Sequence, residues 1–237
     1  MSALSIQSLM DIISQQRFGV EYQPIIATHS GEVFAFEALA RFKNATGEAI
    51  GPLPVFRALH DSPITLFEVE TALKHLQIEN APADHTLFVN VDQDAFAVMG
   101  SDENNPLIAS FQNRDDLVVE IIENSNLADA RISHQMAETF GKYNIRSALD
   151  DIGADESLLS LELLTEVDFL KLAMDWLPRR DNPKYRPLLE CLIHYAHQSG
   201  KQVILEGVET EADLAFAKQI GVDFVQGFLY RPIFRSV

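Results

Sequence analysis

The sequence contains little cysteine and comparatively little positive charge. One of the 237 residues is cysteine, and 35 acidic residues outnumber 18 lysines and arginines, which gives a formal net charge of −17. A single cysteine cannot form an intrachain disulfide, and we expect Cys191, in the apolar stretch LLECLIHYA, to belong to a helix core. The acidic balance argues against binding of duplex nucleic acid or of an anionic membrane surface. A small phosphate-bearing ligand remains compatible with it wherever cations screen the charge.

Long apolar runs and linker-like segments are also missing. No run approaches the roughly 20 apolar residues that a membrane-spanning helix needs. The first 18 residues read as an amphipathic helix and lack the basic start of a signal peptide. We therefore expect no membrane span and a cytoplasmic location. No low-complexity tract, internal repeat or Pro/Gly/Ser-rich linker divides the chain, so we predict a single domain over residues 1–237.

The sequence does contain a regular alternation of short apolar segments with helical periodicity. The predicted strands are 20–26, 33–42, 86–91, 117–122, 145–151, 168–173, 202–208 and 224–229. The predicted helices are 53–60, 65–78, 129–142, 156–164, 184–199 and 210–219. The turn ATHSGE is short enough to make the first two strands antiparallel, whereas the later alternation predicts parallel strands. The pattern indicates an α/β fold of the (β/α)8 type with one irregular strand; a doubly wound open sheet is the alternative.

Polar side chains recur within or at the end of successive predicted strands. They are Glu37, Asn90, Glu120, Asp150, Asp151, Lys171, Glu206 and Gln226. In a parallel barrel these strand ends converge on one face, where carboxylates would repel one another unless cations lie among them or some take up protons. Oxygen ligands favour Mg²⁺, Mn²⁺ or Ca²⁺ over zinc. Two alternatives remain: several of these acids are surface charges, and Glu37 forms an ion pair with Arg41 on the same face of its strand.

Several motifs along the chain resemble those of a known family. In order they are EALAR, VNV, VEIIE, LDDIG, LKLA, LEGVET and VQGF, and the similarity runs from YQPI at 22–25 to QGFLYRP at 226–232. This set resembles the EAL-domain family of phosphodiesterases specific for cyclic di-GMP (c-di-GMP). The resemblance implies a modified TIM barrel that hydrolyses c-di-GMP to linear pGpG with two Mg²⁺ or Mn²⁺ ions. It also makes Ca²⁺ a candidate inhibitor and a homodimer a candidate assembly.

The resemblance also implies a role for each matching residue. The first metal ion would be bound by Glu37, Asn90, Glu120 and Asp150, and the second by Asp150, Asp151 and Glu206. The catalytic group would comprise Lys171, Glu206, Asp151 and Glu123, with Lys171 next to the phosphate or the attacking water and Glu123 anchoring the following loop. The dinucleotide would be contacted by Gln23, Leu39, Arg41 and Gln226. Glu209 would be an outer acid of the site.

One loop departs from the family pattern. The family sequence is close to DDFGTGYSSL, whereas this chain reads DDIGADESLL, so Asp155 stands where the pattern has its second glycine. This difference keeps two alternatives open, a receptor that binds c-di-GMP without turnover and a protein-interaction module. Trp176, after the sixth predicted strand, is a candidate for stacking a guanine, with packing against the barrel as the alternative. For His194 and His197 we favour a surface or packing role over a metal pair.

Overall fold

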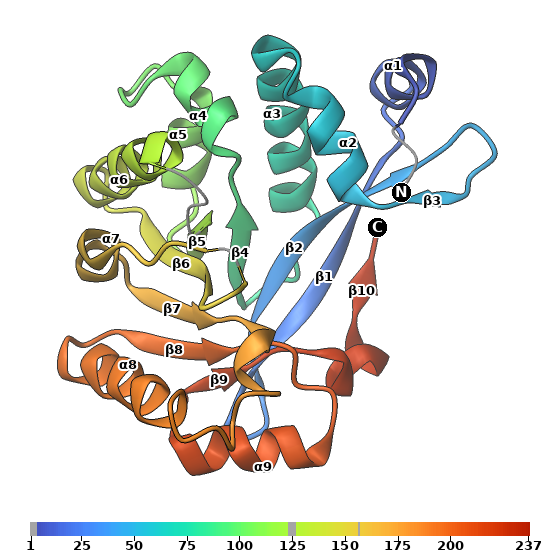
Figure 1. The fold of residues 1–237 in the computed structure, drawn as a ribbon. Helices are drawn as coiled ribbons and strands as arrows, with labels where there is room; N and C mark the ends of the chain where they lie inside the picture. Colours follow the sequence, from blue (N-terminus) through green and yellow to red (C-terminus); the bar gives the residue numbers. More distant parts are fainter. Residues whose placement is uncertain (1–3, 123–126, 156) are drawn as a thin grey trace.

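The computed structural model describes residues 4–122, 127–155 and 157–237. In these ranges eight strands close into a barrel, so the predicted fold class is confirmed (Figure 1). They are β1 (Phe18–Ala27), β2 (Val33–Lys43), β4 (Thr86–Asn90), β5 (Leu117–Ile122), β6 (Arg146–Ile152), β7 (Phe169–Leu172), β8 (Gln202–Leu205) and β9 (Phe224–Val225). Two short strands, β3 (Ala49–Ile50) and β10 (Arg235–Ser236), extend the sheet beside β2 and β1.

Strand β1 is the irregular member of the barrel. It runs antiparallel to both of its barrel neighbours, β2 and β9, whereas the pairs from β2–β4 around to β8–β9 are parallel. The cause is local, because a short turn joins β1 to β2 and leaves no room for a crossover helix. The β1–β2 register places Gln23 directly opposite Glu37.

Helices cover the outside of the barrel. They are α1 (Ile6–Ser14), α2 (Pro52–Leu59), α3 (Pro63–Glu79), α4 (Gln93–Met99), α5 (Pro106–Gln112), α6 (Leu127–Lys142), α7 (Leu161–Glu166), α8 (Arg186–Gln198) and α9 (Glu211–Ile220), with 3-10 turns η1 (Met174–Trp176) and η2 (Phe228–Ile233). None of the helices in the described part of the chain is both long and apolar enough to cross a bilayer.

Several details differ from the sequence prediction; for example, the strand predicted over 202–208 ends at Leu205, and the helix predicted over 156–164 is described as Leu161–Glu166. Helices α4 and α5 were not predicted, because each spans only seven residues and is started by a local cap, the side chain of Asp92 or Asn105, rather than marked by a long apolar period. The last predicted strand is only two residues long. Gly227 then lies so close to Val208 that a Cβ would stand 2.2 Å from the Val208 carbonyl oxygen. Cys191 lies on α8 as predicted but is exposed, since the buried stripe of that helix is Leu189, Leu192, Ile193 and Ala196.

The barrel interior is a layer of apolar side chains, one from each barrel strand. They are Ile25, Ala35, Phe88, Val118, Ala148, Phe169, Ile204 and Phe224, all buried. A larger cluster fills the space between the barrel and its helices, and a third joins α1, α2 and α3. The interior layer is therefore a packed floor, and the site described below lies on top of it.

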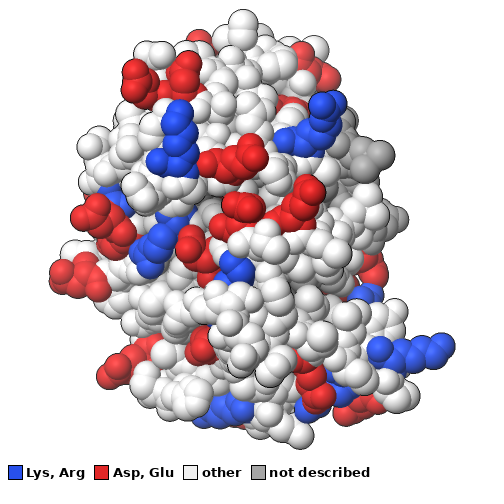
Figure 2. Space-filling model, turned by 90° about the vertical axis from the view of Figure 1, so that its left-hand side faces the viewer, with Lys and Arg blue, Asp and Glu red and all other residues white. Residues whose placement is uncertain are grey.

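Acidic residues outnumber basic ones, and the chain has a formal net charge of −17. Figure 2 shows the side of the molecule on which α6, α7 and α8 lie in Figure 1, and its basic side chains are interspersed with acidic ones rather than gathered into a patch. The basic side chains on this face therefore do not form a continuous patch (Figure 2).

Candidate metal centre and its pocket

The candidate site is the layer of side chains directly above the apolar floor. Each member lies two residues from a floor residue: Gln23, Glu37, Asn90, Glu120, Asp150, Lys171, Glu206 and Gln226. Alternate residues of a strand face the same side, so a strand that points Phe88 into the barrel points Asn90 above it. Strand β1 runs in the opposite direction, and its member, Gln23, therefore precedes the floor residue Ile25 instead of following it.

Lys171 lies at the centre of this layer. Its ammonium Nζ is 2.5 Å from Glu120 Oε1, 2.8 Å from Asp150 Oδ1, 2.9 Å from Glu206 Oε1 and 3.6 Å from Glu37 Oε2. The Lys171 and Glu120 side chains are fully buried. The predicted convergence of acids from separate strands is therefore what the structure shows, with a single ammonium among them.

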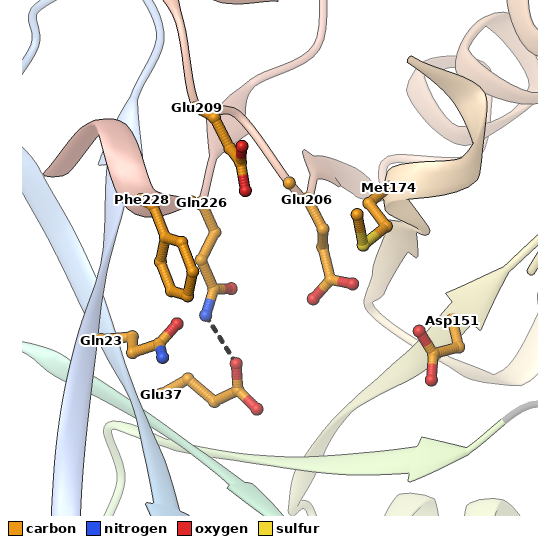
Figure 3. A pocket seen from close by; sticks show the side chains of 10 residues that line it. Gln23, Glu37, Asp151, Met174, Glu206, Glu209, Gln226 and Phe228 are labelled. Atoms are coloured by element: carbon orange, nitrogen blue, oxygen red, sulfur yellow. Dashed lines mark hydrogen bonds between the residues drawn. The ribbon is translucent and has the colours of Figure 1, made fainter. Parts of the chain in front are cut away.

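Two amides hold Glu37 in place. Asn90 Nδ2 donates to Glu37 Oε1 at 2.8 Å. Gln226 Nε2 donates to Glu37 Oε2 at 2.6 Å, the hydrogen bond drawn in Figure 3. Arg41 does not pair with Glu37; its guanidinium lies 2.6 Å from Glu21 Oε1 instead. The ion-pair explanation for Glu37 is thus wrong, and Glu37 points into the same mouth as Asp150.

Both adjacent aspartates of β6 reach the site because the strand is irregular there. In a regular strand, neighbouring side chains point to opposite faces. The β6–β7 register shifts between Leu149 and Ile152, and Asp151 adopts a left-handed backbone with φ 58°. One oxygen each of Asp150, Asp151 and Glu206 consequently lies within 4.8 Å of the others. Strained, bulged backbone of this kind is common at functional sites, where it re-aims a side chain.

The carboxyl groups of the layer carry more negative charge than the single ammonium of Lys171 can balance. Burial, followed by the charges of Asp150, Glu37 and Asp151, outweighs Lys171 and raises the pKa of Glu206 to about 8. Burial and the neighbouring Asp150 raise the pKa of Asp151 to about 6, and burial beside Glu37 raises the pKa of Glu120 well above its usual range. Burial also acts to raise the pKa of Glu37, but Lys171 and the amide donors outweigh it, and that pKa is lowered.

The donor set fits hard divalent cations. Among the described residues, neither oxygen of Glu120 has a hydrogen-bond partner of normal geometry, nor do Asp150 Oδ1 and Gln226 Oε1, although all are buried. In the described part of the chain, the four carboxyl groups and three amides of the layer, together with Asp151, accompany one ammonium, and every atom that these carboxyl and amide groups can offer a cation is oxygen. Mg²⁺, Mn²⁺ and Ca²⁺ prefer such ligands, and a cation there would relieve the repulsion that raises these pKa values.

A pocket of about 340 Å³ opens beside the acids (Figure 3). Its labelled lining side chains are Gln23, Glu37, Asp151, Met174, Glu206, Glu209, Gln226 and Phe228. Met174 and Phe228 were not predicted, although each follows closely on the end of a barrel strand, a position that could have flagged them. Both are more than half exposed and present apolar surface next to the polar layer.

The remaining predicted residues lie elsewhere. Leu39 and Arg41 follow Glu37 along β2 at alternate positions but do not line the pocket, and Glu123 lies outside the described residues. Guanine stacking by Trp176 is wrong, because this side chain is buried and its Nε1 donates to the Ile152 carbonyl at 2.7 Å. His197 lies beside Asp223 on the surface.

The atypical loop after the Asp pair is tied to the segment that follows β7. Arg179 Nη1 donates to the Gly153 carbonyl at 3.2 Å, and the same guanidinium forms an ion pair with Asp155. Asp155, which replaces a glycine of the family pattern, therefore has Arg179 as an ion-pair partner, although its side chain is 79% exposed.

The raised pKa of Glu206 predicts how the stability of the metal-free protein changes with pH. Its folded pKa of about 8 exceeds the ordinary 4.5, so between these values the folded state holds a proton that the unfolded chain has lost. The contribution of protonated Glu206 to the stability of the folded state is therefore complete below pH 4.5, and it is lost as the pH rises through about 8. We expect the melting temperature without metal to fall over this window, and to fall less steeply in Glu206→Gln. Equal slopes for the two proteins would contradict the assignment.

Comparisons with known proteins agree with the fold. The family model described as EAL domain matches residues 6–232. A probable cyclic di-GMP phosphodiesterase of Escherichia coli, PdeB, is 25% identical over 94% of this chain and 44% of its own length. The cyclic di-GMP phosphodiesterase PdeL of the same organism is 24% identical over 89% of this chain and 60% of its own length. The chain thus spans less than two thirds of either relative.

Solved structures show the same fold. An EAL-domain protein of Listeria monocytogenes superposes with a TM-score of 0.78 at 21% identity, covering 100% of this chain and 95% of the other. YkuI of Bacillus subtilis, solved with substrate c-di-GMP and calcium, gives a TM-score of 0.77 at 23% identity, covering 93% of this chain and 57% of the other.

Proposed function

Because the chain belongs to the EAL-domain family, we propose that it hydrolyses c-di-GMP to linear pGpG with two divalent cations at the mouth of the barrel. The observation that carries the proposal is the ring of oxygen donors on successive strands around Lys171. An unused ring of buried acids would only destabilise the fold, since each buried carboxylate costs several kcal/mol unless it is compensated.

The short distances between neighbouring donors support two ligand sets. We propose that one ion is bound by Glu37, Asn90, Glu120 and Asp150, and the other by Asp150, Asp151 and Glu206. A pair of such ions lowers the pKa of a water molecule and stabilises the charge that develops on the phosphate oxygens.

The protein's own residues then divide the remaining work. Lys171 supplies a buried positive charge where negative charge develops in the transition state. Deprotonated Asp151 and Glu206 are needed to complete the second ligand set, so cation binding releases the protons that their raised pKa values retain. Glu123 is proposed to anchor the loop after the Asp pair.

The pocket beside the acids suits a dinucleotide. Gln23 and Gln226 offer amide groups to the ligand, and Phe228 and Met174 offer apolar surface to a base. Arg41 and Leu39 extend β2 from Glu37 toward the outside, and the guanidinium of Arg41 can bind a phosphate as a bidentate donor once it leaves Glu21. We therefore assign Gln23, Leu39, Arg41 and Gln226 to substrate binding.

We propose Mg²⁺ or Mn²⁺ as the active ions and Ca²⁺ as an inhibitor. Ca²⁺ accepts more ligands at longer distances and holds them less rigidly than Mg²⁺. A site filled with Ca²⁺ would then bind the dinucleotide without the strict geometry that attack by water needs.

The protein is proposed to act in the cytoplasm. The exposed Leu158, Leu159 and Leu161 support its association as a homodimer.

A second candidate, a c-di-GMP receptor without turnover, is favoured by one observation. The loop after Asp151 departs from the family sequence, and Arg179 contacts it at Gly153 and Asp155. A loop held in the wrong position would leave the ligand bound and the attack slow.

Incubation of the purified chain with c-di-GMP and Mn²⁺, followed by chromatography, separates these functions. We expect pGpG to be released, and we expect no release from Glu37→Ala, because that variant loses a proposed metal ligand. Tight binding of c-di-GMP without pGpG would establish the receptor instead. Absence of both binding and turnover would leave the interaction module.

A further inference from the structure

Helix α3 carries a row of polar side chains on its buried face, away from the site just described. Glu70 and Lys74 are each 2% exposed, and Gln77 is 1% exposed. Their spacing of four and three residues places them on one side of the helix. The Glu70–Lys74 pair is separated by 3.2 Å and lies outside the ring around Lys171. Buried ion pairs contribute little net stability, so this one needs another explanation.

Glu70 holds the chain just beyond β4. Its Oε1 accepts a hydrogen bond from the main-chain N–H of Asp92 at 3.0 Å. The parallel pairing of β4 with β2 ends at Val89 and Ala38, so Asp92 lies past the last pair of that ladder. Asp92 then caps α4 with its own side chain. The metal ligand proposed above, Asn90, is thus paired with Glu120 of β5 but lies past the β2 ladder, two residues before the hydrogen bond of Asp92 to α3.

Gln77 holds β2 in the same manner. Its Nε2 donates to the carbonyl of Ala38 at 3.0 Å, next to Glu37. The main-chain carbonyl of Gln77 accepts from the hydroxyl of Tyr22 at 2.8 Å, next to Gln23 on β1. Hydrogen bonds from α3 therefore reach residues close to three members of the polar layer, namely Asn90, Glu37 and Gln23.

We propose that Glu70, fixed on α3 by Lys74, and Gln77 are positioning residues that set the ends of β4 and β2 so that Asn90 and Glu37 reach one cation together. The inference rests on the proposed metal-dependent function. The Asn90–Glu37 hydrogen bond of 2.8 Å shows how closely the two side chains must be matched. Removing a residue that orients a metal ligand typically lowers the affinity for the metal about 10- to 100-fold.

Two double variants isolate the hydrogen bond to Asp92. Glu70→Gln/Lys74→Met removes both charges but keeps a carbonyl oxygen in place of the acceptor, whereas Glu70→Leu/Lys74→Met removes the acceptor as well. Mn²⁺ binding to the full chain is measured by calorimetry, and melting temperature is measured without metal. We expect the Leu/Met variant to bind Mn²⁺ about 10-fold more weakly than the Gln/Met variant. Glu68→Gln, which removes an exposed carboxylate from the same helix, is the control and should bind as wild type does.

A purely structural role would give a different result. It would lower the melting temperature of the variants and leave their Mn²⁺ affinities equal, which would overturn the proposal. If the double variants fail to fold, Gln77→Met decides, because it removes the donor to Ala38 and keeps similar volume; unchanged Mn²⁺ affinity would then reject the role.

Wild-type turnover is assayed separately. Mn²⁺ binding without release of pGpG contradicts the phosphodiesterase activity and leaves the positioning comparison intact, whereas no Mn²⁺ binding by wild type rejects both.

Discussion

Replacing Lys171 with methionine is expected to lower the turnover of c-di-GMP by about 10²- to 10³-fold, the usual effect of removing one preorganised group that stabilises transition-state charge. Lys171 is fully buried and lies within 3.6 Å of four carboxylates, so water cannot substitute for its ammonium. The measurement is pGpG formation at saturating Mn²⁺ and c-di-GMP. Lys184→Met removes an exposed lysine and serves as the matched control.

The same variant separates catalysis from folding. Without metal, the loss of the ammonium leaves the carboxylates with no counter-charge, and breaking a buried pair in this way costs about 3–5 kcal/mol. Mn²⁺ should restore most of this stability, because the cations replace the missing charge. Thermal unfolding with and without Mn²⁺ measures the difference. A Lys171→Met protein that is as active as wild type would contradict the assigned role, whatever its stability.

Replacing Asp150 with asparagine is expected to reduce turnover by about 10³-fold, because this residue is proposed to bind both ions. This factor corresponds to a loss of about 4 kcal/mol of metal-dependent stabilisation of the transition state. Asp150 lies 2.8 Å from Lys171 and shares a cluster with Asp151 and Glu206. The amide keeps the size of the side chain and removes its charge. Turnover and the number of Mn²⁺ ions bound per chain are measured together.

The stoichiometry distinguishes a shared ligand from a ligand of one ion. If Asp150 binds both, the variant loses affinity at both sites, whereas Glu206→Gln should weaken only one. Asp181→Asn, on an exposed stretch, provides the control. Two Mn²⁺ ions bound with wild-type affinity in Asp150→Asn would reject the assignment of this residue.

Much of the fold and most of the site could be predicted from the sequence, because strand periodicity is local. A strand that alternates inward and outward side chains defines which residues share a face, so Phe88 in the barrel floor implies Asn90 above it. The order of strands and helices then predicts a parallel barrel whose strand ends converge. The short turn after β1 predicts its antiparallel direction. Short capped helices such as α4 escaped prediction because their signal lies in one side chain rather than in a period.

The sequence by itself therefore determined most of the residues that face the mouth of the barrel, whereas only the tertiary structure decided their partners and brought two adjacent aspartates to the same site. The partner of a long side chain depends on strands brought alongside from elsewhere in the chain, and so Arg41 pairs with Glu21 on β1 rather than with Glu37. The shifted register of β6 against β7 determines that Asp150 and Asp151 both reach the site. The buried contacts of Glu70 and Gln77 with the ends of β4 and β2 likewise exist only once α3 packs against the barrel, since no local pattern encodes a hydrogen bond between distant segments.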